Sequence, residues 1–275
     1  MEFNKILVVK HEKENPKHIL TVNRVLEILN ELKKDFSCIK FNELHDSHFE
    51  DKDLIITIGG DGTFIRTTHF IRGETPILGI NSEPETSEGA LTTLNRDEIE
   101  NLKEILCGEC EIIKRLRARV IRNGELVKEL ALNEVYVGAA NQFHTSRYVI
   151  KHRNEEEEHR SSGVLVLTGA GSDAWYKSAG GKPFNHDEEK LKFLVREPFT
   201  RRIFQPKLTK GEIEKDEKII FESKREDGGV ISVDSWAIYD FNKGDIVEIR
   251  LSSQPLNVIA KNNKKAKLKA YKNDK

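Results

Sequence analysis

The feature that most constrains the fold is an apolar segment, residues 54–58, that runs directly into Gly-Gly-Asp-Gly-Thr at residues 59–63. Glycine loses more backbone entropy on folding than any other residue, so three glycines at the end of a buried strand are costly. A turn without Cβ atoms lets backbone amides approach a phosphate closely, and Asp61 adds a carboxylate to the same space. The segment therefore predicts a strand, a phosphate-binding turn and a phosphoryl-transfer site.

The Gly59–Thr63 turn differs from a Walker A loop, because it lacks both the GxxxxGK[ST] spacing and the lysine of that motif. Without this lysine, phosphoryl transfer depends on backbone amides, the N-terminus of the following helix and a metal ion. Asp61 is suited to orient or deprotonate an attacking hydroxyl, mainly through positioning, because a carboxylate is a weak base. The alternative is an ordinary glycine-rich turn in which Asp61 only caps a helix.

Residues 1–110 alternate short apolar segments with segments of helical period. The expected strands are residues 6–9, 38–41, 54–58 and 76–80, and the expected helices are residues 19–34, 63–71 and 97–107. This alternation predicts an N-terminal α/β domain, Rossmann-like, with a parallel sheet and helices on both faces. Ligands of such sheets bind at the carboxyl ends of the strands, where the Gly59–Thr63 turn is expected to lie.

Residues 111–258 are expected to form a second, mostly-β domain. Asn123-Gly124 predicts a type I′ hairpin turn. Further strands are expected at residues 130–137, 147–151, 164–167, 219–222, 230–233 and 246–251, a helix only at residues 172–179, and a solvated loop at the acidic run 155–158. Residues 259–275 form a lysine-rich tail that we expect to be disordered, with polyanion binding as the alternative.

Composition narrows the class of protein. The 275 residues carry 45 Lys and Arg and 46 Asp and Glu, a net charge of −1, so no global field favours nucleic acid or a membrane surface. No apolar run approaches the roughly 20 residues that span a bilayer, and residues 1–5 do not resemble a signal peptide, so we expect a cytoplasmic protein.

Three cysteines argue against a disulfide framework. The CxxC spacing of Cys107 and Cys110 fits a turn after a helix, with a metal or redox site as the alternative.

Two places in the second domain are candidates for contact with a ligand. Asn133 and Glu134 form a polar pair inside an apolar segment, where burying unpaired polar groups is expensive. One amide and one carboxylate together can hold two vicinal hydroxyls, as ribose presents them; the alternative is a structural hydrogen-bonded pair. Asp234 ends the expected strand 230–233, where a carboxylate serves either as a turn former or as a site residue.

The sequence Gly169-x-Gly171-x-x-Ala174 follows the expected strand 164–167 and resembles the dinucleotide fingerprint of dehydrogenases. That fingerprint requires a full crossover helix and a parallel strand that ends in an acid. Here only a short helix is expected before Gly180-Gly181 stops it. We therefore expect this segment to hold a nucleotide in a different way.

Taken in order, these motifs resemble the NAD kinase family. The phosphate-site motif of the family matches residues 59–63, its next strand residues 78–81, its asparagine–glutamate pair residues 132–134, and its Thr-Pro-Thr-Gly-Ser-Thr-Ala-Tyr…Ala-Gly-Gly stretch residues 168–181. The sequences at residues 81–89, 161–163, 168–175 and 195–198 look most like the divergent mitochondrial-type members. The resemblance covers about residues 50–250.

The resemblance implies an ATP-dependent NAD kinase, in which Mg²⁺ bridges the donor phosphates and Asp61 acts on the 2′-hydroxyl of the adenosine ribose. It places the donor phosphates around Gly59, Gly60, Gly62 and Thr63. It places NAD or NADH against Asn133, Glu134, Gly171, Ser172, Asp173, Ala174, Trp175 and Asp234, with a ribose held by the first two. Members of this family are usually oligomeric, which implies a homodimer or a larger homo-oligomer formed through an exposed edge of the β domain.

The sequence departs from the family pattern where the nucleotide is expected. Asp173 replaces a threonine, Trp175 replaces a tyrosine, Gly169-Ala170 replaces Pro-Thr, and Ser235 replaces the glycine after the late aspartate. Two alternatives stay open: a lipid kinase of the diacylglycerol or sphingoid-base type, which shares Gly-Gly-Asp-Gly-Thr, and a nucleotide-sensing regulator with a decayed kinase site. The sequence leaves open ATP or polyphosphate as donor, and NAD or NADH as acceptor.

Overall fold

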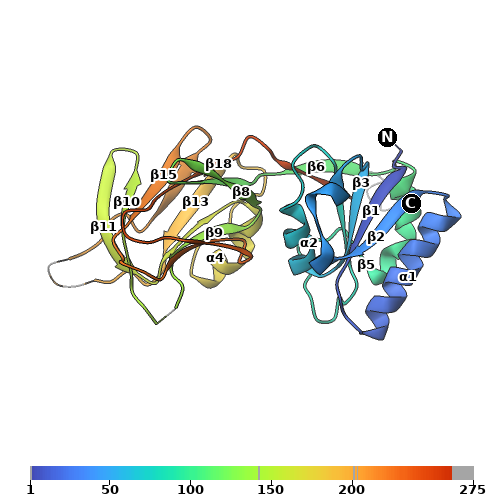
Figure 1. Ribbon diagram of the computed structural model, residues 1–275, viewed down its shortest axis with the longest axis horizontal. Coiled ribbons are helices and arrows are strands. Elements are labelled where there is room, and N and C mark those ends of the chain that lie inside the picture. Colours follow the sequence, from blue (N-terminus) through green and yellow to red (C-terminus); the bar gives the residue numbers. More distant parts are fainter. Residues whose placement is uncertain (1, 142, 201, 203, 262–275) are drawn as a thin grey trace, which may run out of the picture. The chain divides into compact units, whose positions relative to one another are not determined.

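The computed structural model describes residues 2–141, 143–200, 202 and 204–261, and it divides into two compact units. One unit is Met1–Lys114 together with the segment that begins at Leu256, and the other is Arg115–Pro255. Figure 1 shows the helices and strands of the first unit and the strands of the second. Residues 262–275 lie outside the described residues, so the expectation for the lysine-rich tail stays a prediction. Among the described residues, no helix is both long and apolar enough to cross a membrane.

The first unit is built on a seven-stranded sheet in the order β2-β1-β3-β4-β19-β6, with β5 beside β4. Its strands are β1 (Lys5–Lys10), β2 (Asp35–Lys40), β3 (Leu54–Gly59), β4 (Ile77–Asn81), β5 (Leu94–Asn95), β6 (Glu111–Arg115) and β19 (Leu256–Ala260). Its helices are α1 (Pro16–Glu31), α2 (Asp61–Thr68) and α3 (Leu102–Leu106), with 3-10 turns η1 (Phe41–Glu43), η2 (Asp46–Phe49) and η3 (Arg96–Asn101). The pairs that join β2, β1, β3, β4, β5 and β19 are parallel, and α1 and α2 lie on opposite faces of the sheet (Figure 1). The predicted α/β domain with a parallel sheet is confirmed.

Local sequence explains where α1 begins and which face it buries. Asn15 accepts a hydrogen bond from the Lys17 amide at 2.9 Å, and Pro16 occupies the first helical position, where a missing N–H does no harm. The helix then buries a stripe of apolar side chains in the core that it shares with β1 and β3, which comprises Val22, Val25, Ile28 and Leu29. Because α1 follows β1, its N-terminus lies at the carboxyl edge of the sheet, where ligands of such folds bind.

The second unit consists of two six-stranded antiparallel sheets, in the orders β11-β10-β15-β18-β7-β8 and β14-β13-β12-β9-β16-β17. Their strands are β7 (Ala118–Arg122), β8 (Glu125–Ala131), β9 (Glu134–Ala139), β10 (Ser146–His152), β11 (Glu155–Ser161), β12 (Val164–Leu167), β13 (Lys190–Val195), β14 (Lys210–Glu214), β15 (Lys218–Ser223), β16 (Gly229–Val233), β17 (Ala237–Asp240) and β18 (Ile246–Leu251). Side chains of both sheets, such as Val135 and Phe221, form one buried core. Asn123 and Gly124 have φ 51° and 83°, as the predicted type I′ turn requires. The predicted mostly-β unit is confirmed.

The last strand, β19, returns to the sheet of the first unit. Its residues Leu256 and Ile259 are fully buried, and the strand pairs with β4 in parallel at Val258. The expected domain ends at residues 258 and 259 therefore fall inside a strand of the first sheet. The short apolar pattern of β19 fits a strand of either unit equally well, so the pattern alone does not predict which sheet β19 joins.

The acidic run at residues 155–158 begins β11, the edge strand of its sheet. Arg153, with φ 54°, lies in the tight turn that joins β10 to β11. The Glu157 carboxylate accepts hydrogen bonds from the amides of Lys207 and Leu208 at 2.8–3.0 Å, whereas the other three glutamates are exposed. The expectation of a loop was wrong, because the solvent side of an edge strand tolerates, and is even protected by, a row of charges.

Candidate functional site

The Gly59–Thr63 turn lies where β3 passes directly into α2, as predicted. Gly59 is the last residue of β3, Gly60 is the N-cap of α2 with φ −97° and ψ −172°, and Asp61 is the first helical residue. The amides in the first turn of an α-helix have no acceptor within the helix, and they carry the positive end of the helix dipole. The turn therefore directs N–H groups toward an anion at the carboxyl edge of the sheet.

The three glycines of the turn meet different constraints. A Cβ atom at Gly59 would lie 2.5 Å from Oγ1 of Thr63, and one at Gly60 would lie 2.6 Å from Oγ of Ser87. A Cβ atom at Gly62 would meet no described atom within 4 Å. Close packing thus explains the first two glycines, whereas the third leaves open space over the start of α2, as a closely approaching ligand needs.

Thr63 presents an unused hydroxyl beside the same turn. Its side chain is buried, and its Oγ1 has no hydrogen-bond partner in the part of the chain that the structure describes. A buried hydroxyl without a partner costs free energy, so such groups are rare in folded proteins. The position of this hydroxyl suits hydrogen bonding to a phosphate oxygen.

Asp61 is held by the loop that follows β4. Its two carboxylate oxygens accept hydrogen bonds from the amides of Ala90 and Leu91, at 3.0 Å and 2.9 Å. The side-chain amide of Asn81 donates to the Ser87 carbonyl oxygen at 2.9 Å and so fixes the start of this loop. Each carboxylate oxygen of Asp61 keeps a second lone pair, so the oriented side chain can still accept a hydrogen bond or a proton from a hydroxyl.

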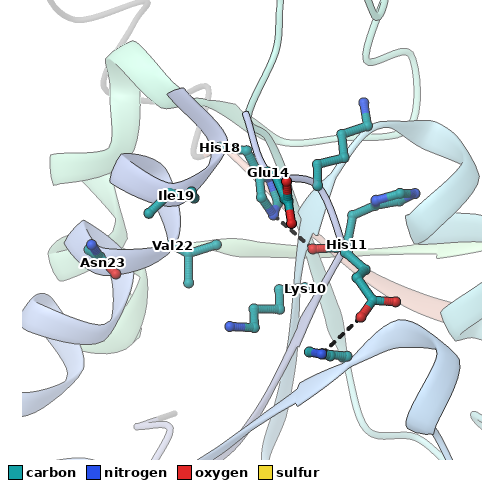
Figure 2. A pocket seen from close by; sticks show the side chains of 10 residues that line it. Lys10, His11, Glu14, His18, Ile19, Val22 and Asn23 are labelled. Atoms are coloured by element: carbon teal, nitrogen blue, oxygen red, sulfur yellow. Dashed lines mark hydrogen bonds and ion pairs between the residues drawn. The ribbon is translucent and has the colours of Figure 1, made fainter. Parts of the chain in front are cut away.

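A pocket of about 250 Å³ lies at the carboxyl ends of β1 and β2 (Figure 2). Lys10 and Lys40 line it from the two strands; Lys40 pairs with Glu12 at 2.8 Å, whereas Lys10 has no carboxylate partner among the described residues. The His11 amide donates to the Ile58 carbonyl oxygen at 3.1 Å, which joins the loop after β1 to the end of β3. Lys10, whose residue pairs with Ile58 of β3, therefore adds a cation beside the strand that ends in the phosphate-binding turn.

A hydrogen-bonded network ties the loop after β1 to the loop after β4. Nε2 of His18 donates to the His11 carbonyl oxygen at 3.0 Å (Figure 2), and its Nδ1 accepts from the Ser82 hydroxyl at 2.9 Å. Burial lowers the pKa of His18, which fits a neutral ring with one donating and one accepting nitrogen. Lys13 forms an ion pair with Glu83. This network was not predicted from the sequence, although His11 and Lys13 belong to a charged run, residues 10–14, that directly follows the buried part of β1.

In the second unit, Asp234 holds the residues around Glu134 in place. Its carboxylate accepts hydrogen bonds from the amides of Leu132 at 2.7 Å, Asn133 at 2.7 Å and Glu134 at 3.0 Å. Burial raises the pKa of Asp234 to about 6, against the opposing effects of these three amides and of the charge on buried Arg117. Because both oxygens are engaged by the backbone, this side chain positions the neighbouring pair.

Asn133 and Glu134 each present an oxygen that the protein leaves unsatisfied. Oδ1 of Asn133 and Oε2 of Glu134 are buried and have no hydrogen-bond partner among the described residues. Burial, and next the charge of Asp234, raise the pKa of Glu134 to about 8, so its carboxyl group can donate as well as accept near neutral pH. The structure thus brings these three predicted site residues together, and the two unsatisfied oxygens indicate a ligand site.

The raised pKa of Glu134 makes stability depend on pH. Its folded-state pKa of about 8 lies above the ordinary value of 4.5, so the folded state binds this proton more tightly than the unfolded state. The resulting stabilisation is complete below pH 4.5 and is lost as pH rises through about 8. We expect Glu134→Gln, which stays neutral, to be more stable than wild type above pH 8 by up to about 5 kcal/mol, at about 1.4 kcal/mol for each unit between the two pKa values, and to match it near pH 4.5. Urea unfolding across this range measures the difference, and parallel pH curves would contradict the raised pKa.

The segment after β12 packs its backbone against the Asn133 region. The Thr168 hydroxyl donates to the Leu132 carbonyl oxygen at 2.5 Å and accepts a hydrogen bond from the Ala170 amide at 3.1 Å. A Cβ atom at Gly171 would lie 2.3 Å from the Asn133 carbonyl oxygen, so glycine is required for this close approach. In place of one helix at residues 172–179, the segment forms a 3-10 turn, η4 (Ala170–Asp173), and a short helix, α4 (Trp175–Ser178).

Ser172 and Asp173 of this segment have different surroundings. Ser172 is fully buried, and its hydroxyl donates to the carbonyl oxygen of Phe184 at 3.1 Å. Asp173 is exposed, and its carboxylate lies 4.0 Å from Nζ of Lys177 and 3.7 Å from Nε2 of His186. The carboxylate of Asp173, which stands where the family has a threonine, therefore lies beside the ammonium group of Lys177 and the imidazole ring of His186.

Trp175 is already flanked by two side chains. Its ring centroid lies 5.6 Å from that of Tyr136 with an interplanar angle of 23°, and the guanidinium carbon of Arg196 lies 4.8 Å from the ring centroid. These aromatic and cation–π contacts hold the tryptophan ring within the unit. Ala174, the residue before it, is exposed.

The two cysteines with CxxC spacing lie in the turn that follows α3. No group of three or more His, Cys, Asp or Glu side chains that could hold a metal ion occurs among the described residues. Cys38, Cys107 and Cys110 are free thiols, and burial raises the pKa of the Cys110 thiol, which disfavours the reactive thiolate. Cys107 and Cys110 follow α3 directly, as expected for a turn after a helix.

Comparison with known proteins identifies the family. A family model described as the ATP-NAD kinase N-terminal domain matches residues 7–109. The chain is 30% identical over 270 residues to a probable NADH kinase of Oryza sativa subsp. japonica, and the alignment covers 90% of this chain and 82% of that protein. The chain belongs to the NAD kinase family. The NAD kinase of Methanosarcina mazei is 32% identical over 209 residues, which cover 75% of this chain and 69% of that protein.

Solved structures of NAD and NADH kinases share the fold. The NAD kinase of Archaeoglobus fulgidus, solved in complex with ATP, matches with a TM-score of 0.73 and 24% identity over 94% of each chain. The yeast NADH kinase, solved in complex with NADH, matches with a TM-score of 0.80 and 15% identity over 94% of this chain and 84% of that one. These similarities confirm the predicted fold class, an α/β N-terminal domain followed by a mostly-β C-terminal domain.

Proposed function

We propose that this protein transfers the γ-phosphoryl group of ATP to the 2′-hydroxyl of the adenosine ribose of NAD or NADH, giving NADP or NADPH. Membership of the NAD kinase family supports the reaction. The observation that carries the proposal is the pair of buried oxygens on Asn133 and Glu134, which lack partners among the described residues. An amide oxygen that accepts, beside a carboxyl group that accepts or donates, suits the two vicinal hydroxyls of a ribose.

The donor phosphates are assigned to the Gly59–Thr63 turn. The first-turn amides of α2 supply hydrogen bonds and a favourable dipole, and the open space at Gly62 allows close approach. The Thr63 hydroxyl supplies a further donor, and Lys10 supplies a cation at the neighbouring strand end. This arrangement serves the role that the lysine of a Walker A loop has in other phosphotransferases.

Mg²⁺ fits this donor set as an ion carried in with ATP. In phosphotransferases Mg²⁺ is bound through one or two carboxylates together with substrate phosphates and water. Asp61 supplies such a carboxylate, and the described residues offer no cluster of three or more ligands for an all-protein cage. When bound, the ion neutralises negative charge on the donor phosphates.

Asp61 is assigned to the attacking hydroxyl. The amides of Ala90 and Leu91 fix the direction of its carboxylate. The side chain therefore loses little orientational entropy when a substrate hydroxyl donates a hydrogen bond to it. The carboxylate then holds the hydroxyl proton while the oxygen attacks the γ-phosphorus in line, and the bond from the γ-phosphorus to the β–γ bridging oxygen breaks to release ADP. The amides at the start of α2 stabilise charge on the transferring group.

Gly62→Ala is expected to separate stability from phosphate binding. Alanine fits at residue 62 and is a better helix former, so the free energy of unfolding is expected to rise by about 0.5–1 kcal/mol. The added methyl group blocks the close approach of phosphates, so kcat/KM for ATP is expected to fall by about tenfold or more. Gly59→Ala is the matched variant, which is expected to lower stability by about 1–3 kcal/mol through overpacking against Thr63. Urea unfolding and ATP kinetics measure both effects; normal ATP kinetics for Gly62→Ala would place the phosphates elsewhere.

Two finer assignments extend the proposal. The edge strand β17 exposes Ile238, which supports pairing with a second copy of this chain in a homo-oligomer. The three free thiols support a reducing compartment such as the cytoplasm. Size-exclusion chromatography with light scattering measures the oligomeric state.

The proposal is tested by incubating the purified protein with Mg²⁺, NAD or NADH, and either ATP or inorganic polyphosphate. NADP or NADPH formed with ATP supports the proposal, and the ratio of kcat/KM values gives the acceptor preference. Tight dinucleotide binding without turnover for any donor would support the decayed regulator instead. Phosphorylation of diacylglycerol or a sphingoid base without NADP formation would support a lipid kinase.

A further inference from the structure

The pocket at the carboxyl ends of β1 and β2 has an apolar wall that phosphate binding does not explain. Ile19, Val22 and Asn23 of α1 line one side of it, and Figure 2 shows these three side chains along the helix, with Lys10 on the strand. Ile19 is exposed although its side chain is large and apolar, and Val22 beside it is buried. Phosphate oxygens gain nothing from contact with apolar groups, so this wall suits a different part of a ligand.

The charges that line the pocket are nearly balanced. Two of its three lysines, Lys13 and Lys40, form ion pairs with glutamates. The third lysine, Lys10, and one glutamate of the lining, Glu14, form no ion pair among the described residues. A lining of this kind attracts a highly charged group only weakly. It suits an uncharged group, and the carboxylate of Glu14 can accept hydrogen bonds from hydroxyl groups.

The pocket and the phosphate-binding turn are neighbours along one edge of the sheet. β1 lies between β2 and β3, Lys10 pairs in register with Ile58, and the His11 amide donates to the Ile58 carbonyl oxygen. Neighbouring strands lie about 5 Å apart, so the ends of β2 and β3 are separated by about 10 Å. A ribose with a triphosphate chain can span this distance, and Lys10 lies on the strand between the two ends.

We propose that this pocket holds the adenosine of the ATP donor, with the triphosphate extending to the Gly59–Thr63 turn. The inference rests on the proposed kinase activity, and it favours ATP over inorganic polyphosphate as the donor. The pocket volume of about 250 Å³ lies just below the range of about 300–1,000 Å³ for sites that enclose a whole ligand, which fits one part of a longer molecule.

The side chains of α1 match the two sides of a purine base. Ile19 and Val22 cover an apolar ring face and so remove its surface from water. The side-chain amide of Asn23 carries a donor and an acceptor, which match a ring nitrogen and the amino group of adenine. Glu14 accepts hydrogen bonds from the ribose hydroxyls. Inorganic polyphosphate offers none of these contacts.

Calorimetric titration with ADP and Mg²⁺ tests the pocket without any turnover, in saturating NAD so that the dinucleotide site is occupied. Asn23→Ala is expected to weaken ADP binding by about tenfold and to leave the affinity for pyrophosphate unchanged. Asn30→Ala is the matched control, because Asn30 is also an exposed asparagine of α1 and lies outside the pocket. Wild-type ADP affinity in Asn23→Ala, or an equal loss of pyrophosphate affinity, would overturn the proposal.

Steady-state kinetics connect the pocket with the reaction. Ile19→Ser is expected to raise KM for ATP by about tenfold and to leave KM for NAD unchanged, whereas Leu20→Ser, at an exposed residue of α1 outside the pocket, is expected to change neither. In the wild type, kcat/KM for ATP is expected to exceed that for tripolyphosphate by at least about tenfold. Equal values for the two donors, or a rise in KM for NAD in place of KM for ATP, would overturn the adenosine site and leave the kinase proposal standing. Absence of NADP with every donor would overturn the kinase proposal, whereas weaker ADP binding in Asn23→Ala would still support an adenosine site.

Discussion

Replacing Asp61 by asparagine is expected to lower kcat for dinucleotide phosphorylation by about 10²–10⁴-fold, the range that a positioned acid–base group contributes. The asparagine oxygen still accepts a hydrogen bond from Ala90 or Leu91, but its NH₂ group accepts neither the second amide nor the proton of an attacking hydroxyl. Loss of one such hydrogen bond is expected to lower the free energy of unfolding by about 1 kcal/mol. The rate and the stability should therefore change by very different amounts.

Asp97→Asn is the matched control for this experiment. Asp97 is an exposed aspartate in the first turn of η3, in the same unit, and its nearest cation is Arg96 at 3.5 Å. We expect its substitution to leave kcat within about twofold of wild type, since surface substitutions have small effects. Steady-state kinetics and urea unfolding on the same preparations measure both quantities. Wild-type kcat in Asp61→Asn would contradict the role assigned to this carboxylate.

Removal of the Asp234 side chain is expected to have the largest effect on stability. Asp234→Ala leaves the buried amides of Leu132, Asn133 and Glu134 without an acceptor, a loss that outweighs the relief from removing a buried charge. The free energy of unfolding is expected to fall by about 2–4 kcal/mol. KM for the dinucleotide is expected to rise as well, because the segment that presents the two unsatisfied oxygens is no longer held.

Asp245→Ala separates the two effects of the Asp234 substitution. Asp245 also accepts hydrogen bonds within a turn of the second unit, from the Asn242 amide at 2.8 Å and from the Asn123 side chain at 2.7 Å. Its substitution is expected to lower stability while KM for the dinucleotide stays at the wild-type value. If Asp234→Ala raises KM at unchanged stability, Asp234 contacts the substrate directly instead of positioning its neighbours.

The order of elements in the first unit was predictable because it depends on local signals. The apolar segment at residues 54–58 and the helical period that follows it fix the passage from β3 to α2 without reference to the rest of the chain. The return of β19 was not predictable, because a short apolar segment such as Leu256–Ala260 pairs with whichever sheet the intervening fold brings to it. The strand β11 was hidden because it contains no apolar residue: its buried positions are His159 and Ser161, so it has no alternating apolar pattern.

The candidate site was predictable as a set of residues but not as a set of contacts. Turn chemistry and buried polar residues marked the positions of Asp61, Glu134 and Asp234. That Asp234 is engaged by three backbone amides depends on pairing between β9 and β16, which lie far apart in sequence. The packing of Trp175 between aromatic and cationic neighbours, and the cation Lys10 at the end of β1, likewise arise from tertiary contacts.

The identity of the product tests the central account most directly. Purified protein is incubated with ATP, Mg²⁺ and NAD or NADH, and the phosphorylated dinucleotide is examined by phosphorus NMR and by its use in an NADP-specific dehydrogenase reaction. We expect one new phosphomonoester on the 2′-oxygen of the adenosine ribose, and we expect it to be lost in Asp61→Asn. A phosphate at any other position, or no phosphorylated dinucleotide although ATP and NAD both bind, would contradict it.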